Sequence, residues 1–235
     1  MPRLQKGSGL RFCRALGISL SAAPSECGKR TRLSNVNPQP STEKARLRAR
    51  IREELKAMSS EERAAASLQA CARLEQQEVW RKAGSILFYA PLPEEPDIWQ
   101  LLVDTLAAGK TAALPRFVPE HQVYVACAVQ DIERDVRTGQ FGIREPHESC
   151  VRISLNRLDL MLVPGVAFDL DGRRLGRGKG FYDRLLAAFH GPACGVAFDQ
   201  QIVRRVPVEP HDAHLTCILT PTRWHSVAGP RAVLK

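Results

Sequence analysis

The sequence predicts an α/β fold: one domain in three layers, α/β/α, with helices on both faces of a mostly parallel central sheet. Short apolar runs, rich in residues that favour strands, alternate with longer stretches whose apolar residues recur every three or four positions. The length of 235 residues suffices for one domain with a sizeable core, and no second series of motifs indicates another. The content of 44% hydrophobic and 25% charged residues is ordinary for a globular protein, and no apolar stretch approaches the ~20 residues of a membrane span.

Four helices are predicted from apolar residues that share one face. The first runs from Lys44 to Met58, and Ser59 with Glu62 forms a capping box that begins the second. The third follows an acidic loop and closes at Gly109, and the fourth begins after Gly180. Strands are predicted where short apolar runs lie between turn residues: 85–90, 111–117 including an exit loop, 123–129, 158–163, 193–199 and 215–219.

Most of the basic charge lies at the amino terminus. The chain carries a net charge of +9, and residues 1–42 contain seven Lys or Arg against Glu26 alone, a net +6 that leaves +3 for the remainder. A mildly basic body suits anionic small molecules better than a nucleic-acid duplex. We therefore expect small-molecule substrates as partners, without nucleic acid or a membrane, and we expect a monomer.

Residues 1–42 have no sustained hydrophobic period and are expected to form a disordered tail. The domain is predicted to span 43–225, and 226–235 to form a second tail. The first tail is rich in Arg and Ser and nearly free of acid, which resembles a mitochondrial presequence, whereas a natural tail or a start codon assigned too early are the alternatives.

Seven cysteines are scattered along the chain, and no two of them form a Cys-x-x-Cys motif. This odd number and irregular spacing indicate free thiols in a reducing compartment, and argue against a zinc site or a disulfide framework. We expect a cytoplasmic location, or a mitochondrial one if residues 1–42 are a presequence.

The most informative segment is a glycine-rich turn between a strand and a helix. An apolar run ends at 164–165, and the glycines of 176–180 alternate with Arg177 and Lys179 before an apolar helix face begins. Glycine leaves backbone N–H groups open to an oxyanion, and the helix that follows adds its positive end. The segment therefore favours a polyphosphate ligand, whereas a flexible surface loop with incidental arginines is the alternative.

This turn matches neither of two common phosphate motifs. A P-loop would need glycine where Arg173 stands and Ser or Thr where Gly180 stands. The dinucleotide fingerprint would need glycine where Phe181 stands.

The motif Val163-Pro164-Gly165-Val166-Ala167-Phe168-Asp169, followed by Gly172-x-Arg174-Leu175-Gly176-Arg177-Gly178-Lys179-Gly180-Phe181-Tyr182-Asp183, resembles the signature of the 5-formyltetrahydrofolate cyclo-ligases, or methenyltetrahydrofolate synthetases. Weaker matches extend from about Lys44 to about Leu219. The resemblance implies the ATP-dependent cyclisation of 5-formyltetrahydrofolate to 5,10-methenyltetrahydrofolate, with release of ADP and phosphate. ATP would be the co-substrate and Mg²⁺ the cofactor of this C–N bond-forming ligase.

The resemblance also implies particular site residues. The nucleotide site would comprise basic residues of the first helix and the glycine-rich turn: Lys44, Arg48, Arg174, Leu175, Gly176, Arg177, Gly178, Lys179, Gly180, Phe181 and Tyr182. Arg177 and Lys179 are the candidate catalytic residues, because phosphoryl transfer needs positioning and charge neutralisation. The alternative for Lys44 and Arg48 is a solvated cationic helix face.

The candidate folate ligands come from several segments: Glu95, Arg116, Phe141, Arg177, Gly178, Lys179, Gly180 and Phe181. Glu95 matches the family carboxylate, although an acid at a helix amino terminus is favourable in itself. Arg116 lies at the predicted carboxyl end of a strand, where open α/β sheets bind ligands. Phe141 precedes a Gly-Ile-x-Glu-Pro element that resembles the family's substrate pocket, and a core aromatic is the alternative.

Asp183 and Asp212 match the two family acids associated with magnesium; a first-turn helix acid and a turn residue are the alternatives. The family usually has Asp where Thr216 stands and Glu where Pro221 stands. Two rival functions stay open: a sugar-phosphate isomerase-like enzyme of similar architecture, and a basic nucleic-acid-binding protein that depends on the tail and the first helix.

Overall fold

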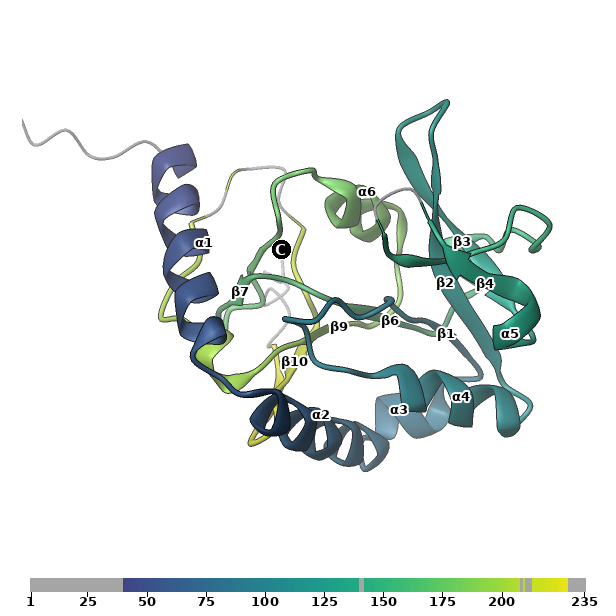
Figure 1. Ribbon diagram of the computed structural model, residues 1–235, viewed down its shortest axis with the longest axis horizontal. Coiled ribbons are helices and arrows are strands. Elements are labelled where there is room, and N and C mark those ends of the chain that lie inside the picture. The colour runs from purple at the N-terminus through teal and green to yellow at the C-terminus, as the bar shows by residue number, and fades with distance from the viewer. Residues whose placement is uncertain (1–39, 140–141, 208, 210–212, 228–235) are drawn as a thin grey trace, which may run out of the picture. The chain divides into compact units, whose positions relative to one another are not determined.

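A seven-stranded sheet, in the order β11-β10-β9-β6-β1-β2-β3, forms the centre of the described part of the chain. Figure 1 labels its strands from β10 to β3. The computed structural model describes residues 40–139, 142–207, 209 and 213–227. The chain divides into two units, and all described residues belong to the unit Pro38–Lys235. The strands of the sheet are β1 (Ser85–Leu87), β2 (Thr111–Val118), β3 (Val123–Val129), β6 (Leu160–Val163), β9 (Ala193–Val196), β10 (Cys217–Leu219) and β11 (Trp224–Ser226).

The centre of this sheet is parallel and its two edges are antiparallel. Strands β2, β1, β6, β9 and β10 pair in parallel, whereas β3 and β11 pair antiparallel with their neighbours. The chain proceeds from β1 to β2 on one side and later returns to β6 on the other side of β1. The strand order therefore reverses between β1 and β6, which is the position where open α/β sheets leave a crevice for ligands.

Alternate residues of the central strands pack against opposite layers of helices. On one face, Ile86 and its equivalents contact α2 (Ser60–Glu75), α3 (Glu78–Lys82) and α4 (Trp99–Ala107). On the other face, Leu87 and its equivalents contact α6 (Phe181–Ala188) and the short helix η1 (Leu155–Arg157). Because both faces are covered, the buried strands are apolar throughout, and β6 is buried at all its positions. The predicted three-layer α/β arrangement is confirmed.

Helix α1 (Pro40–Lys56) covers a third cluster rather than a face of the sheet. Its Ile51 and Leu55 pack with residues of the ribbon β7 (Ala167–Phe168) and β8 (Arg174–Leu175), and with Phe198 before η2 (Asp199–Gln201). The helix begins four residues before the predicted Lys44, so 40–42 are helical and not part of a disordered tail. The predicted tail otherwise lies outside the described residues.

Several short elements were not predicted. The long loop expected between β6 and the glycine-rich turn contains the antiparallel ribbon β7–β8. A second ribbon, β4 (Val136–Thr138) with β5 (Arg144–Pro146), follows α5 (Ile132–Asp135). Strands of two or three residues are too short to show an alternating pattern, which explains why the sequence did not reveal them.

The capping box is confirmed, since Glu62 N–H donates to Ser59 Oγ at 3.1 Å and Ser59 N–H donates to a Glu62 carboxylate oxygen at 2.7 Å. The five cysteines within the described residues are free thiols. Within the same part of the chain, no helix is both long and apolar enough to span a membrane.

Candidate active site

A pocket of about 240 Å³ opens where the strand order reverses. Its walls come from the segment after β1, from Pro164 and Gly165 directly after β6, and from residues of the glycine-rich turn and the start of α6. Residues 143–145, in and beside β5, complete the lining. The carboxyl ends of two neighbouring parallel strands thus supply one side of the pocket, and the predicted phosphate-binding turn supplies another.

The glycine-rich turn adopts a backbone that requires glycine. Gly178 has φ +103° and Gly180 has φ +66°, and Gly180 is the N-cap residue of α6. Helix α1 is fastened to the same turn, because Arg48 Nε donates a hydrogen bond of 2.8 Å to the carbonyl of Gly176. The turn therefore presents the positive end of α6, and the cations Arg177 and Lys179, to the pocket.

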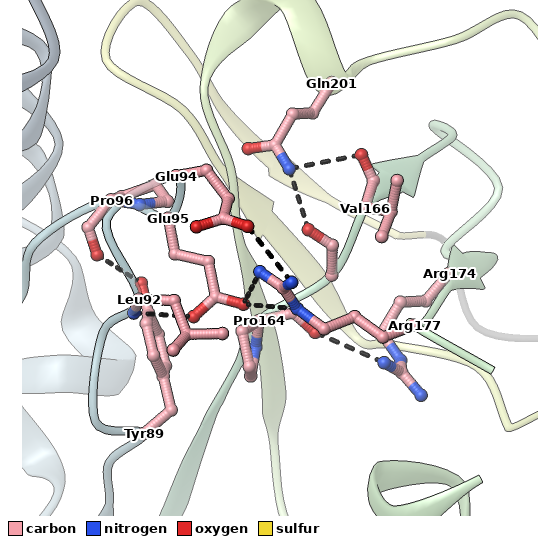
Figure 2. A network of polar contacts seen from close by, with 11 residues as sticks. Tyr89, Leu92, Glu94, Glu95, Pro96, Pro164, Val166, Arg174, Arg177 and Gln201 are labelled. Carbon is pink, nitrogen blue, oxygen red and sulfur yellow. Dashed lines mark hydrogen bonds and ion pairs between the residues drawn. The ribbon is translucent and has the colours of Figure 1, made fainter. Parts of the chain in front are cut away.

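Arg177 joins this turn to the acidic loop after β1 (Figure 2). Its Nε and Nη2 donate to the same oxygen of Glu95 at 3.3 and 3.1 Å, and its Nη1 donates to Glu94 at 3.2 Å. The segments lie 82 residues apart in the sequence. The candidate phosphate ligand and the candidate folate ligand therefore meet in one pocket.

Glu95 is a buried carboxylate, with only 7% of its side chain exposed. Burial raises its pKa, and the Arg177 guanidinium and a hydrogen bond from the backbone oppose that shift. The backbone donor is Leu92 N–H, 3.1 Å from the second oxygen. Tyr89 further holds the loop, because its hydroxyl donates to the carbonyl of Pro96 at 2.7 Å (Figure 2).

A second ion pair lies beneath the turn. Arg174 donates to Asp183 at 2.5 Å and to the carbonyl of Pro164 at 3.2 Å, and only 3% of its side chain is exposed. Its Nε has no hydrogen-bond partner among the described residues. Tyr182 packs nearby, with its ring centre 5.7 Å from the guanidinium carbon of Arg174. Arg174 therefore binds the end of β6 to the first turn of α6.

Buried polar side chains hold the chain between β6 and the turn. Asp169 is fully buried and accepts from the backbone N–H groups of Asp171, Arg173 and Val206, which fixes the bend of the β7–β8 ribbon. Gln201 donates to the carbonyl of Gly165 at 2.7 Å (Figure 2).

An aromatic cluster forms another wall of the pocket. The ring of Phe181 lies edge-on to Tyr124 and Phe117, with ring centres 4.9 and 5.5 Å apart. Glu145 accepts from the backbone N–H of Phe117 at 3.0 Å and lies 3.5 Å from the hydroxyl of Tyr124. Burial, together with the charge of Glu145, raises the pKa of Tyr124 to about 12.

Some predicted site residues do not reach this pocket. Arg116 lies within β2 and not at its end, and its guanidinium donates to the carbonyls of His147 and Glu148. Leu175 packs its side chain into the cluster beneath α1. Arg116 therefore does not end a strand as predicted, and the side chain of Leu175 lies in the core; their assignments as substrate and nucleotide ligands stay predictions. Lys44 is nearly buried and lies 2.7 Å from a carboxylate oxygen of Glu209.

Two further candidates, Phe141 and Asp212, lie outside the described residues. The two described positions that depart from the family pattern contact other segments of the fold. The hydroxyl of Thr216 accepts from Ala193 N–H at 2.9 Å, and the carbonyl of Pro221 accepts from Arg73 Nε at 3.0 Å.

The described residues contain no cluster of three His, Cys, Asp or Glu side chains that could hold a metal ion by itself. Asp183 is the predicted magnesium ligand among them, and it lies in the pocket with one oxygen paired to Arg174. Mg²⁺ usually binds one or two carboxylates, substrate phosphates and water, so a single available carboxylate oxygen fits a magnesium–nucleotide complex.

Fold and site together define an α/β enzyme with a cationic, glycine-rich turn at the switch point of its sheet. A model of the 5-formyltetrahydrofolate cyclo-ligase family matches residues 40–221, and the chain belongs to this family. The 5-formyltetrahydrofolate cyclo-ligase of Mus musculus is 30% identical over 184 residues, which cover 74% of this chain and 91% of the relative. That of Mycolicibacterium smegmatis is 42% identical over 145 residues, 59% of this chain and 74% of the relative.

The fold is shared with a solved structure from the family. The 5,10-methenyltetrahydrofolate synthetase of Aquifex aeolicus, determined by NMR, matches with a TM-score of 0.72 and 31% identity. The match covers 82% of this chain and 96% of the Aquifex chain.

Sequence reasoning missed several residues that shape the site. Glu94 shares Arg177 with Glu95, and Gln201 supports the end of β6 from a separate segment. Neither belongs to a motif of its own, because their roles arise from contacts between segments far apart in the sequence. The acid pair Glu94-Glu95 opposite a cationic turn was the one signal from which the role of Glu94 could have been inferred.

Proposed function

We propose that this protein catalyses the ATP-dependent cyclisation of 5-formyltetrahydrofolate to 5,10-methenyltetrahydrofolate, with release of ADP and phosphate. The observation that carries this proposal is the contact between Arg177 of the glycine-rich turn and Glu95 of the acidic loop. A cationic turn suited to phosphates and a buried carboxylate suited to N–H donors share one pocket. A sugar-phosphate site would not require the second of these features.

The chemistry explains why both features are needed. The formyl oxygen of the substrate is a poor leaving group, so attack by the N10 amine alone does not close the ring. Transfer of the γ-phosphoryl group of ATP to that oxygen forms an O–P bond and releases ADP. The N10 lone pair then attacks the activated carbon, the C–O bond breaks to release phosphate, and N10 loses its proton.

The side chains of the turn serve the phosphoryl transfer by position and charge. Arg177, Lys179 and the N–H groups at the start of α6 would neutralise the charge that develops on the transferred group. Asp183 would help to hold Mg²⁺, which neutralises phosphate charge when bound. Arg174 would act indirectly, because its ion pair with Asp183 orients that carboxylate.

Arg177 also couples the two substrates. In the free enzyme it neutralises Glu95, and an arriving triphosphate would compete with Glu94 and Glu95 for its guanidinium. Once Arg177 turns to the phosphates, the buried Glu95 needs other donors, since an unpaired buried charge is costly. The N–H groups of the pteridine edge would supply them.

Turnover tests this proposal. The absorbance of the methenyl product should appear when ATP, Mg²⁺ and 5-formyltetrahydrofolate are all present, and not when any one is omitted. Arg177→Ala and Lys179→Ala should each lower kcat/KM by about 10²-fold or more, as loss of a transition-state charge ligand does.

The matched control is Arg81→Ala, an exposed arginine in α3 that does not line the pocket. It should retain wild-type turnover, and circular dichroism should show all three variants folded. Turnover that needs no nucleotide would contradict the proposal and favour the isomerase-like alternative.

A further inference from the structure

An arginine outside the phosphate-binding turn also lines the pocket. Arg144 is the first residue of β5, and its guanidinium carbon lies 3.5 Å from the centre of the Trp99 ring. Trp99 is the first residue of α4, four positions beyond Glu95 in the sequence. The side chain of Arg144 is thus held by a contact between the β4–β5 ribbon and the start of α4, shortly after the loop that carries Glu95.

The stacking contact fixes the position of Arg144 and leaves its charge available. Arginine prefers to lie flat on an aromatic face, where the ring attracts the cation and its N–H groups still point outward. Within the described residues, no hydrogen bond or ion pair occupies this guanidinium, and the residue is exposed. The neighbouring Glu145 does not neutralise it, since that buried carboxylate accepts from Phe117 and Tyr124.

Charged groups of both signs line the pocket, and among them Glu95 and Arg144 differ in burial. Glu95, which is buried, presents a carboxylate, and Arg144, which is exposed, presents a cation. A ligand that fits both has N–H donors at the end that enters and a carboxylate at the end that remains near solvent. A planar guanidinium suits a carboxylate because it can donate two parallel hydrogen bonds.

We propose that Arg144, held on Trp99, determines substrate specificity by binding a carboxylate of the glutamate tail of the reduced folate. This inference rests on the proposed function and deepens it, because it assigns the tail of the substrate to a particular side chain. The glycine-rich turn provides the cations for the nucleotide, so Arg144 is left for the second substrate.

Two substrates that differ only in the tail test the assignment: 5-formyltetrahydrofolate and the primary amide of 5-formyltetrahydropteroate, in which a neutral carboxamide replaces the glutamate. In Arg144→Gln, KM for the glutamate-bearing substrate should rise about tenfold, the effect of losing one hydrogen bond to a charged group. Its kcat, KM for ATP and KM for the pteroyl amide should not change. Arg144→Lys, which keeps the charge without the fork, should recover part of the loss.

Arg137→Gln is the matched control, because Arg137 is an exposed arginine on the partner strand β4 that does not line the pocket. It should leave all constants at wild-type values. Trp99→Leu removes the support of Arg144 and should raise KM for the glutamate-bearing substrate by a smaller factor.

The proposal is overturned if Arg144→Gln raises KM for both substrates equally, or raises KM for ATP instead. If the wild-type protein converts neither substrate, the proposed function itself fails and this assignment fails with it. If the wild type is active and Arg144→Gln has the same ratio of KM values for the two substrates, the assignment of Arg144 fails while the proposed function stands.

Discussion

The central residue of the candidate site is Glu95, a buried carboxylate that accepts hydrogen bonds from Arg177. Burial raises the pKa of Glu95, whereas Arg177 and the N–H of Leu92 lower it, and the balance still leaves the pKa above its ordinary value. The charge of Glu95 therefore depends on its donors. If Arg177 moves to a phosphate group, Glu95 loses the hydrogen bonds from that guanidinium. Folate binding then depends on N–H groups of the substrate taking their place.

This balance predicts the pH dependence of folate binding. The ordinary pKa of a glutamate is about 4.3, so a raised value means that Glu95 accepts a proton at a higher pH than other glutamates do. Affinity for 5-formyltetrahydrofolate, measured by equilibrium binding without nucleotide, should fall as the pH falls through that raised pKa. Arg177→Gln removes the opposing cation and should move this decrease to higher pH.

The raised pKa of Glu95 has the opposite effect on folding stability, which should decrease as the pH rises. A carboxyl group whose pKa is higher in the folded than in the unfolded state binds more protons when folded. Its contribution to stability is present below the unfolded pKa and is lost as the pH rises through the folded pKa.

The control for the pH dependence of folate binding is Glu95→Gln, which has no carboxyl group to protonate. This variant should bind folate weakly, and its affinity should not decrease further at acid pH. If its affinity decreased over the same pH range as that of the wild type, the assignment to Glu95 would be contradicted.

The residues that could be predicted are those whose spacing carries the signal. Arg177 and Lys179 were predicted because they alternate with glycines, and the structure brings both to the pocket with Glu95. The ion pair between Arg174 and Asp183 was not predicted, because each residue had been assigned to a ligand instead. Arg144 was also missed, since an isolated arginine beside a turn gives no signal until Trp99 is placed beneath it.

At the scale of elements, the glycine-rich turn depends on a backbone conformation that other residues resist. Gly180 has φ +66° and caps α6, and an added Cβ would come no closer than 3.7 Å to Arg184. A side chain would therefore find space, and the cost of substitution lies in the backbone. Gly109 offers the same conformation elsewhere, with φ +70° after α4 and no atom within 4 Å of an added Cβ.

This pair allows strain to be separated from function. Gly180→Ala and Gly109→Ala should each lower the free energy of unfolding by about 1–2 kcal/mol, the cost of a left-handed conformation for a residue with a Cβ. Only Gly180→Ala should weaken ATP binding, because it distorts the N–H groups at the start of α6. Urea denaturation and nucleotide titration measure the two effects, and equal loss of ATP affinity in both variants would contradict a role for this turn.

Elements with strong periodicity were predicted and short ones were not. The central strands and the helices α2, α4 and α6 follow from apolar patterns that extend over a whole element. The ribbons β4–β5 and β7–β8 depend on tertiary support, such as the N–H of Val206, which donates to the carboxylate of Asp169 at the bend between β7 and β8. Such contacts join distant parts of the chain and leave no local pattern.

At the scale of the whole molecule, the site is a consequence of strand order. The reversal between β1 and β6 brings together the loop with Glu95, the bend at Pro164 and the turn at Arg177, although they come from distant segments. The parallel centre of the sheet could be predicted from the alternation of strands and helices. The antiparallel pairing of β11 at one edge could not, because that strand has only three residues and no apolar run.

The charge distribution leads to a prediction about the amino-terminal segment. Residues 1–39 carry a net +6, and within the described residues the glycine-rich turn accepts a hydrogen bond from Arg48 of α1. A chain shortened to begin at residue 40 should therefore keep its kcat and its KM for ATP. Arg48→Ala in that shortened chain removes the hydrogen bond to the carbonyl of Gly176 and should raise KM for ATP. The full-length chain and the chain that begins at residue 40 also test the nucleic-acid alternative. Any weak, salt-sensitive binding to a DNA duplex should be lost with residues 1–39, whereas turnover should remain. Loss of turnover on removing residues 1–39 alone would show that the basic segment belongs to the catalytic machinery.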